Sequence, residues 1–110
     1  MKPDDRLNEM HADLCKVFTS PARIQILNEL RDGEKSVGQL ADATGLPQPN
    51  VSQHLAVMRS RGILTSRKEG AVVYYHLTNP KVLKAFDIIR EVLYESLAAN
   101  SRLAKGGRRS

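Results

Sequence analysis

The sequence predicts a mainly α-helical fold with a small β-hairpin, namely a winged helix-turn-helix with its elements in the order α-α-α-α-β-β-α. Three observations support this fold class. Residues 36–61 contain two short helical patterns separated by the turn-forming run T-G-L-P. Residues 63–77 contain two β-rich runs separated by K-E-G. Apolar residues recur at helical spacing near both ends of the chain, which indicates an amphipathic helix at each end.

The first two helices are expected before residue 33. The first runs from about Asp5 to Phe18, and its apolar stripe consists of Leu7, Met10, Leu14 and Val17. Ser20 and Pro21 then match an N-cap followed by proline in the first helical turn. The second helix ends by Gly33, and its apolar face consists of Ile24, Leu27 and Leu30.

The third helix is short and begins with a capping signal. Ser36 and Gln39 have the spacing of a capping box, in which each side chain bonds the other residue's backbone N–H. The helix reaches about Ala43, and its inward residues are Val37, Leu40 and Ala41. Gly45 allows the tight turn that follows, and Leu46 is expected to fill the angle between this helix and the next.

The fourth helix starts with two prolines. Pro47 and Pro49 fit its first turn, because the backbone N–H groups there have no helical partner. The helix runs to about Arg61, Gly62 ends it, and its core stripe consists of Val51, Leu55 and Met58. This pair of helices joined by a tight turn is the predicted helix-turn-helix.

A hairpin and a last helix complete the domain. Residues 63–68 and 72–77 are the two expected strands, with Glu69 and Gly70 at the turn. Asn79 and Pro80 then begin a helix whose apolar face consists of Val82, Phe86, Ile89, Leu93 and Leu97. We expect one domain over residues 5–99 and a disordered basic tail over residues 100–110.

Charge and composition narrow the class of protein. The net charge is +5, and it is concentrated in residues 47–77 and in residues 102–110. Such clustering is typical of proteins that bind a polyanion, although the tail alone also fits a solvated chain end. The absence of a membrane-length apolar run, of a signal-peptide pattern and of a second cysteine leads us to expect a cytoplasmic protein.

The exposed side of the fourth helix carries short polar side chains. Its N-terminal half presents Gln48, Asn50, Ser52 and Gln53 away from the core stripe. Glutamine and asparagine can bind adenine through two hydrogen bonds, and serine can reach base edges or a phosphate. On an isolated helix we would interpret this set as a solvated face. Between a capped helix and a hairpin, it predicts a helix that reads double-stranded DNA.

Four basic residues are candidates for contacts with the DNA backbone. Arg67 and Lys68 lie at the hairpin tip, and Arg59 and Arg61 lie at the end of the fourth helix. Cations at such places position a protein on a duplex without reading its sequence. A solvated hairpin is the alternative interpretation of the tip.

These motifs resemble a known family. The runs P-Q-P-N-V-S-Q-H-L-A-V-M-R-S-R-G-I-L, R-K-E-G-A-V-V-Y-Y-H-L and F-T-S-P-A-R-I-Q-I-L are similar to those of ArsR-type (ArsR/SmtB) winged-helix repressors. The resemblance implies a homodimer that binds an operator and is released by an inducer. It also implies base contacts at Gln48, Ser52 and Gln53, with Val37 at the start of the preceding helix. Pro49 lies where many members have serine, so one contact of the DNA-binding set departs from the family pattern.

The dimer is expected to use both terminal helices. Their apolar stripes exceed what a monomer of this length can bury, so the predicted dimerisation residues are Leu7, Met10, Leu14, Phe86, Ile89, Leu93 and Leu97.

The inducer is left open by the sequence. The two familiar metal sites of the resembled family lack their ligands here, in the third helix and in the last. His11 and Cys15 share a face of the first helix at i, i+4, which makes them the candidate ligands of a transition metal ion. Two ligands are fewer than a closed zinc site needs. The alternatives are a thiol switch at Cys15, or a Cys15 that is only a small buried core residue.

Other classes of function fit the sequence less well than DNA binding. Neither a catalytic triad, a paired-carboxylate site nor a Gly-rich phosphate loop is apparent, so we do not expect an enzyme. A winged-helix module that binds protein or RNA is the remaining alternative. A protein-docking face should be apolar, and the exposed face of the fourth helix is polar.

Overall fold

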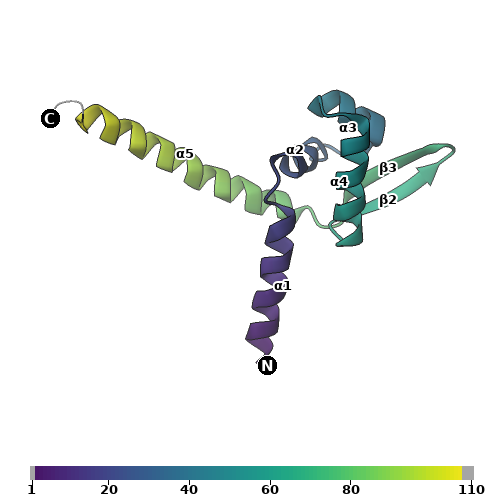
Figure 1. The fold of residues 1–110 in the computed structure, drawn as a ribbon, viewed down its shortest axis with the longest axis horizontal. Coiled ribbons are helices and arrows are strands. Elements are labelled where there is room, and N and C mark those ends of the chain that lie inside the picture. The colour runs from purple at the N-terminus through teal and green to yellow at the C-terminus, as the bar shows by residue number, and fades with distance from the viewer. Residues whose placement is uncertain (1, 108–110) are drawn as a thin grey trace. The chain divides into compact units, whose positions relative to one another are not determined.

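The computed structural model describes the backbone of residues 2–107 and the side chains of residues 2–101. The chain divides into two compact units, residues 1–79 and residues 80–110. The first unit contains all the elements of the predicted helix-turn-helix and hairpin (Figure 1): α1 Pro3–Val17, α2 Pro21–Glu29, β1 Lys35–Ser36, α3 Val37–Thr44, α4 Gln48–Ser60, β2 Leu64–Glu69 and β3 Val72–Leu77. The second unit contains α5, Lys81–Gly107. The predicted fold class is confirmed, with one additional short strand.

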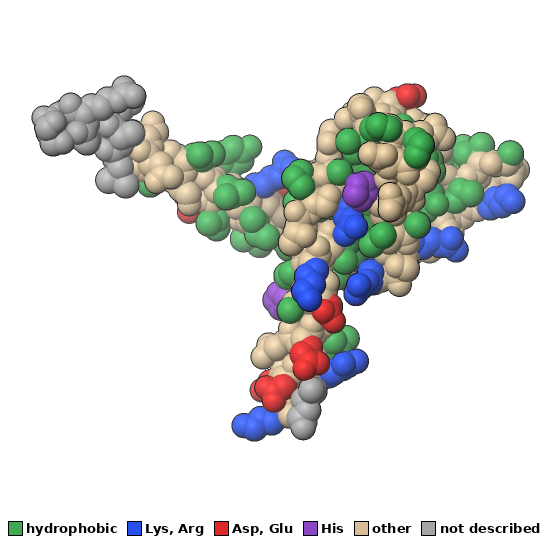
Figure 2. Space-filling model, in the orientation of Figure 1, with side chains coloured by type: hydrophobic (Ala, Val, Ile, Leu, Met, Phe, Trp, Pro, Cys, Tyr) green, Lys and Arg blue, Asp and Glu red, His purple; other side chains and the backbone are tan. Residues whose placement is uncertain are grey.

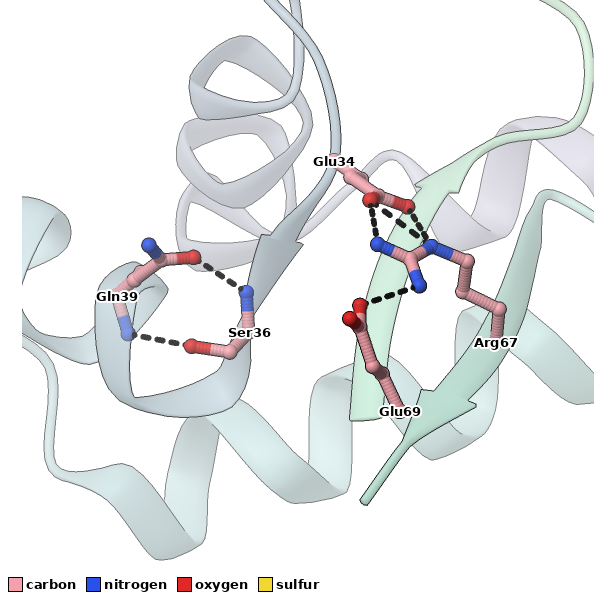
Figure 3. Close-up of polar contacts among 5 residues, drawn as sticks. All are labelled: Glu34, Ser36, Gln39, Arg67 and Glu69. Atoms are coloured by element: carbon pink, nitrogen blue, oxygen red, sulfur yellow. Dashed lines mark hydrogen bonds and ion pairs between the residues drawn. The ribbon is translucent and has the colours of Figure 1, made fainter. Parts of the chain in front are cut away.

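The helix boundaries follow from local capping. The Ser20 hydroxyl accepts a hydrogen bond of 3.4 Å from the backbone N–H of Arg23, at the start of α2. At the start of α3, the Gln39 N–H donates to the Ser36 hydroxyl at 3.2 Å, and the Ser36 N–H donates to the Gln39 side chain at 2.9 Å (Figure 3). Gly45 ends α3 with a φ of 74°, a left-handed conformation that favours glycine. The predicted capping box and turn are therefore confirmed.

The core of the first unit lies among α2, α3 and α4, with β2 packed against α4. Its fully buried side chains are Ile26, Leu27, Leu40, Val51, Leu55 and Met58. The stripe predicted on α4 is confirmed in full. On α2 the prediction was partly wrong, because Ile26 is buried whereas Ile24 is only half-buried.

The sheet has the strand order β1-β3-β2, and all neighbours are antiparallel. In the wing, defined here as residues 64–77, Leu64 lies opposite Leu77 and Arg67 opposite Tyr74. Gly70 at the turn has a φ of 60°. The sequence did not predict β1, since two residues are too few to show a strand period. This strand joins the start of α3 to the wing.

The second unit differs from the expectation at its C-terminal end. The sequence predicted a disordered tail from residue 100, whereas α5 continues to Gly107. The segment L-A-A-N-S-R-L-A-K contains good helix formers and no proline, which explains the continuation of the helix. Residues 108–110 lie outside the described part of the chain. Among the described helices, none is both long and apolar enough to span a membrane.

Candidate nucleic-acid interface

The two sides of α4 separate packing from recognition. Val51, Leu55 and Met58 are completely buried, so the direction of the opposite side is fixed by the core. All four predicted base-reading residues are exposed, with Gln53 opposite the buried stripe, Asn50 and Ser52 on its flanks, and Gln48 at the N-terminal end of the helix. Amide and hydroxyl groups on a rigid, exposed helix match the hydrogen-bonding pattern of base edges in a major groove.

The start of α4 offers few backbone donors for a phosphate. Pro49 is exposed and has no N–H group, and the N–H of Asn50 donates to the Pro47 carbonyl at 3.0 Å. The polar groups that the start of α4 presents to solvent are therefore mainly those of its side chains. Val37, at the start of α3, is half-buried and leaves only part of its side chain available to DNA.

The basic residues of α4 lie at its other end. Arg59 and Arg61 are exposed, and Gly62 ends this segment with a φ of 76°. At a helical rise of 1.5 Å per residue, Arg59 lies about 16 Å along the axis from Gln48. The two arginines therefore lie well away from the residues that the sequence predicts to read bases.

The predicted backbone contact Arg67 has partners that the sequence did not reveal. Its Nε donates to both carboxylate oxygens of Glu34, at 2.8 and 2.9 Å, and its Nη1 donates to Glu69 at 2.7 Å (Figure 3). The hydrogen bonds from Arg67 lower the pKa of Glu34, and those to Glu34 and then Glu69 raise the pKa of Arg67. Lys68, the other predicted residue of the tip, is exposed. Glu34 was missed because it lies 33 residues from Arg67 in the sequence.

A second contact missed by the sequence analysis supports α4. Arg23 on α2 donates from Nε to Nδ1 of His54 on α4 at 3.2 Å. The same guanidinium donates from Nη1 to the Val17 carbonyl, in the last turn of α1, at 3.5 Å. Arg23 therefore connects the end of α1 to the middle of α4. Partial burial, and then the nearby charge of Arg23, lower the pKa of His54.

This histidine should make stability depend on pH. A lowered pKa in the folded state means that protons bind the unfolded chain more readily, so the stabilising contribution is complete above about pH 6.5 and is lost as pH falls through the lowered value. We expect thermal unfolding to occur at lower temperature at about pH 5.5 than at about pH 7.5, and His54→Gln to reduce that difference. Melting curves at both pH values measure it. His76→Gln is the matched control, and an equal change in both variants would contradict the assignment to His54.

Both terminal helices expose apolar side chains. On α1, Leu7, Met10 and Leu14 are 63%, 55% and 43% exposed. On α5, Figure 2 shows apolar side chains along the visible side, and the exposed ones include Ile88, Ile89, Val92, Leu93, Tyr94 and Leu97. Two of the residues missed by the sequence analysis, Ile88 and Val92, repeat at i, i+4 beside the predicted stripe. An apolar surface of this kind marks an interaction site.

The prediction for Phe86 departs from the structure. Phe86 is only 7% exposed and Leu83 is similarly buried in the single chain, unlike Ile89, Leu93 and Leu97. A helical stripe identifies apolar residues but does not distinguish those buried within one chain from those left for a partner.

The candidate metal ligands lie on an exposed stretch of α1. His11 and Cys15 are both exposed, so the interpretation of Cys15 as a buried core residue is wrong for the single chain. Within the described part of the chain, no group of three or more His, Cys, Asp or Glu side chains is placed to hold a metal ion. His11 and Cys15 alone are fewer ligands than a closed zinc site needs.

Comparison with known proteins identifies the family. Residues 20–66 match the family described as "Bacterial regulatory protein, arsR family". The chain is 36% identical over 80 residues to the HTH-type transcriptional regulator KmtR of Mycobacterium tuberculosis, covering 73% of this chain and 61% of KmtR. It thus spans less than two thirds of the length of that relative. It is 38% identical over 78 residues to the biofilm growth-associated repressor of Xylella fastidiosa, covering 71% of this chain and 68% of the repressor.

A solved structure agrees with these sequence relatives. The homodimeric winged helix-turn-helix DNA-binding domain of Mb0332 from Mycobacterium bovis has a TM-score of 0.76 to this chain and 30% sequence identity. The similarity covers 88% of this chain and 90% of the Mb0332 domain. The resemblance inferred from the sequence motifs is confirmed. The chain belongs to the ArsR family of bacterial regulatory proteins, which are DNA-binding regulators of transcription and not enzymes.

Proposed function

We propose that this protein is a cytoplasmic transcriptional repressor that binds an inverted-repeat operator as a homodimer and leaves it in response to a signal. The observation that carries the proposal is the exposed, uncharged polar face of α4, whose direction is fixed by three fully buried residues on the opposite side. In this arrangement α4 enters the major groove, while Arg59, Arg61 and the wing follow the sugar–phosphate backbone.

The exposed apolar faces of α1 and α5 support the homodimer. The Mb0332 domain is described as homodimeric, and the apolar residues exposed here are available to a second copy of the chain. A two-fold dimer places its reading helices about 34 Å apart, in successive major grooves, which accounts for an inverted repeat.

An operator selection tests the proposal. Duplexes selected from a random pool by the purified protein should contain an inverted repeat with half-sites about one helical turn apart. Binding of the selected duplex should exceed that of a shuffled duplex by at least about a thousandfold at physiological salt. A single-half-site duplex is the matched control and should bind weakly. Equal binding of all duplexes, or preference for RNA, would contradict the proposal.

The signal is proposed to be either a transition metal ion or a non-metal inducer, and the metal can be assigned to particular residues. If a transition metal releases the protein from DNA, its ligands should include His11 and Cys15, which share one face of α1. Because α1 exposes part of the apolar surface, ligation there can change the dimer and so the spacing of its reading helices.

Substitution of the cysteine distinguishes the two forms. If zinc, cobalt or nickel releases the wild type in DNA-release titrations, Cys15→Ser should abolish that release, while the matched control His76→Ala should retain it. Release that persists in Cys15→Ser would contradict the metal site. If no metal releases the wild type, the result favours constitutive binding or a non-metal inducer.

A further inference from the structure

We propose that Arg67 positions the wing and does not contact DNA, and that Lys68 makes the wing's contact with the sugar–phosphate backbone. This inference rests on the proposed function, because it assigns roles within the same DNA-binding surface. It replaces the expectation that both residues of the tip meet phosphates.

The guanidinium of Arg67 is held on three sides. Glu34 accepts from Nε, and also from Nη2, while Glu69 accepts from Nη1 at 2.7 Å. The guanidinium carbon lies 4.8 Å from the centre of the Tyr74 ring, which faces it across the strand pair. Two carboxylates and an aromatic ring thus fix one planar group, a geometry that suits arginine and not lysine. We call Glu34, Arg67, Glu69 and Tyr74 the wing clamp (Figure 3 shows its charged members).

The charge of the wing clamp disfavours a phosphate at Arg67. One cation is surrounded by two carboxylates, so the group carries a net negative charge at neutral pH. A phosphate approaching Arg67 would have to displace Glu34 and Glu69, and both would remain close to it. Like charges at such distances repel, and the repulsion opposes the contact.

Lys68 lies on the other face of the wing from Arg67 and, among the described residues, has no carboxylate partner. Successive residues of a strand point to opposite faces, so Lys68 points away from the face that holds Arg67 and Glu69. Lys68 is exposed, and within the described part of the chain it forms no ion pair. A lysine binds phosphate as a point charge and needs no fixed geometry. Of the two basic residues at the tip, Lys68 is therefore the one available to a phosphate.

The wing clamp also links the wing to the helix-turn-helix. Glu34 directly precedes β1, whose residue Lys35 pairs with Tyr75 on β3. Ser36, the second residue of β1, caps α3. The bonds between Glu34 and Arg67 therefore restrain the wing relative to the start of α3, and through α3 relative to α4. Loss of these bonds should let the wing move in the free protein, so that more conformational freedom is lost when Lys68 binds the duplex, although Lys68 still meets the same phosphate.

Glu34→Gln tests the inference, because the two possible roles of Arg67, contacting a phosphate or positioning the wing, lead to opposite changes in operator affinity. If Arg67 met a phosphate, removal of the carboxylate would free it and strengthen binding. If Arg67 positions the wing, the same change should weaken operator binding by about three- to fivefold, the size expected for an exposed ion pair. Asp32→Asn is the matched control, since it removes the same charge two residues away and should not weaken binding. Melting curves confirm that each variant folds.

The salt dependence of operator affinity gives a readout that a purely structural role would not change. The salt slope is the magnitude of the slope of the logarithm of operator affinity against the logarithm of salt concentration. Lys68→Gln should lower this slope by about one unit per subunit. Arg67→Gln should weaken binding and leave the slope unchanged. Arg67→Lys should behave like Arg67→Gln, because lysine keeps the charge but not the fork. The double variant Glu34→Gln/Arg67→Gln should be no weaker than Arg67→Gln alone.

The outcomes separate this inference from the proposed function. Wild-type protein without operator preference would overturn the proposed function, and this inference with it. Wild-type preference combined with tighter binding by Glu34→Gln, or with a lower salt slope in Arg67→Gln, would overturn this inference alone. Faster hydrogen exchange of the wing amides in Glu34→Gln than in Asp32→Asn, measured without DNA, is the expected sign that the wing has been released.

Discussion

Leu93→Glu is expected to abolish operator binding by converting the dimer into monomers. Leu93 is 55% exposed in the single chain and lies between Ile89 and Leu97 on the apolar face of α5. A carboxylate buried at that position in a dimer would lose its hydration without gaining a partner, which is costly. A monomer contacts one half-site, so operator affinity should fall by at least about a thousandfold, towards the non-specific level.

Sedimentation velocity and operator titration should change together in this variant. Ala98→Glu is the matched control, because it adds the same charge to α5 at an exposed position about 140° around the helix from Leu93. It should remain dimeric and bind normally. A dimeric Leu93→Glu protein with wild-type operator affinity would show that this face of α5 does not form the dimer.

Gln53→Ala should reduce discrimination between operator and random DNA. Gln53 lies on the exposed side of α4, opposite the fully buried Leu55 stripe, and the substitution removes its amide without disturbing the core. A well-placed bidentate contact to a base contributes about 1–3 kcal/mol of discrimination in each half-site. The loss should appear as a smaller ratio of operator affinity to random-DNA affinity, with little change in random-DNA binding.

Arg59→Gln provides the contrast to this variant on the same helix. It should weaken binding to all duplexes alike and lower the salt slope by about one unit per subunit, because Arg59 is proposed to contact the sugar–phosphate backbone of the DNA. An unchanged affinity ratio in Gln53→Ala would show that the reading face is assigned to the wrong side of α4, whatever the result for Arg59.

Local signals made most of the fold predictable from the sequence. The capping box at Ser36, the left-handed Gly45 and the core stripe of α4 each depend on residues a few positions apart, and the structure contains all three. Polar contacts between distant segments were not predictable. Arg23 lies 31 residues from His54, and Glu34 lies 33 residues from Arg67. No periodicity connects such pairs, since their proximity arises only after the helices and the sheet have packed.

Burial on the terminal helices was also not predictable from the sequence. Helical spacing predicted correctly that α1 and α5 are amphipathic, but it grouped Phe86 with Leu93, although the first is buried and the second exposed. Burial depends on which surfaces the chain itself covers, and one helical period does not contain that information.

The exposure of Cys15 has a practical consequence. It is the only cysteine in the sequence, and its side chain is exposed on α1. A maleimide or nitroxide reagent should therefore modify each subunit at one position, without any engineered cysteine. Two spin labels in a dimer give a single interprobe distance, which pulsed electron resonance can follow in the free protein, on operator DNA and with candidate inducers. Labels at the native Cys15 would thus report the separation of the two α1 helices in a dimer.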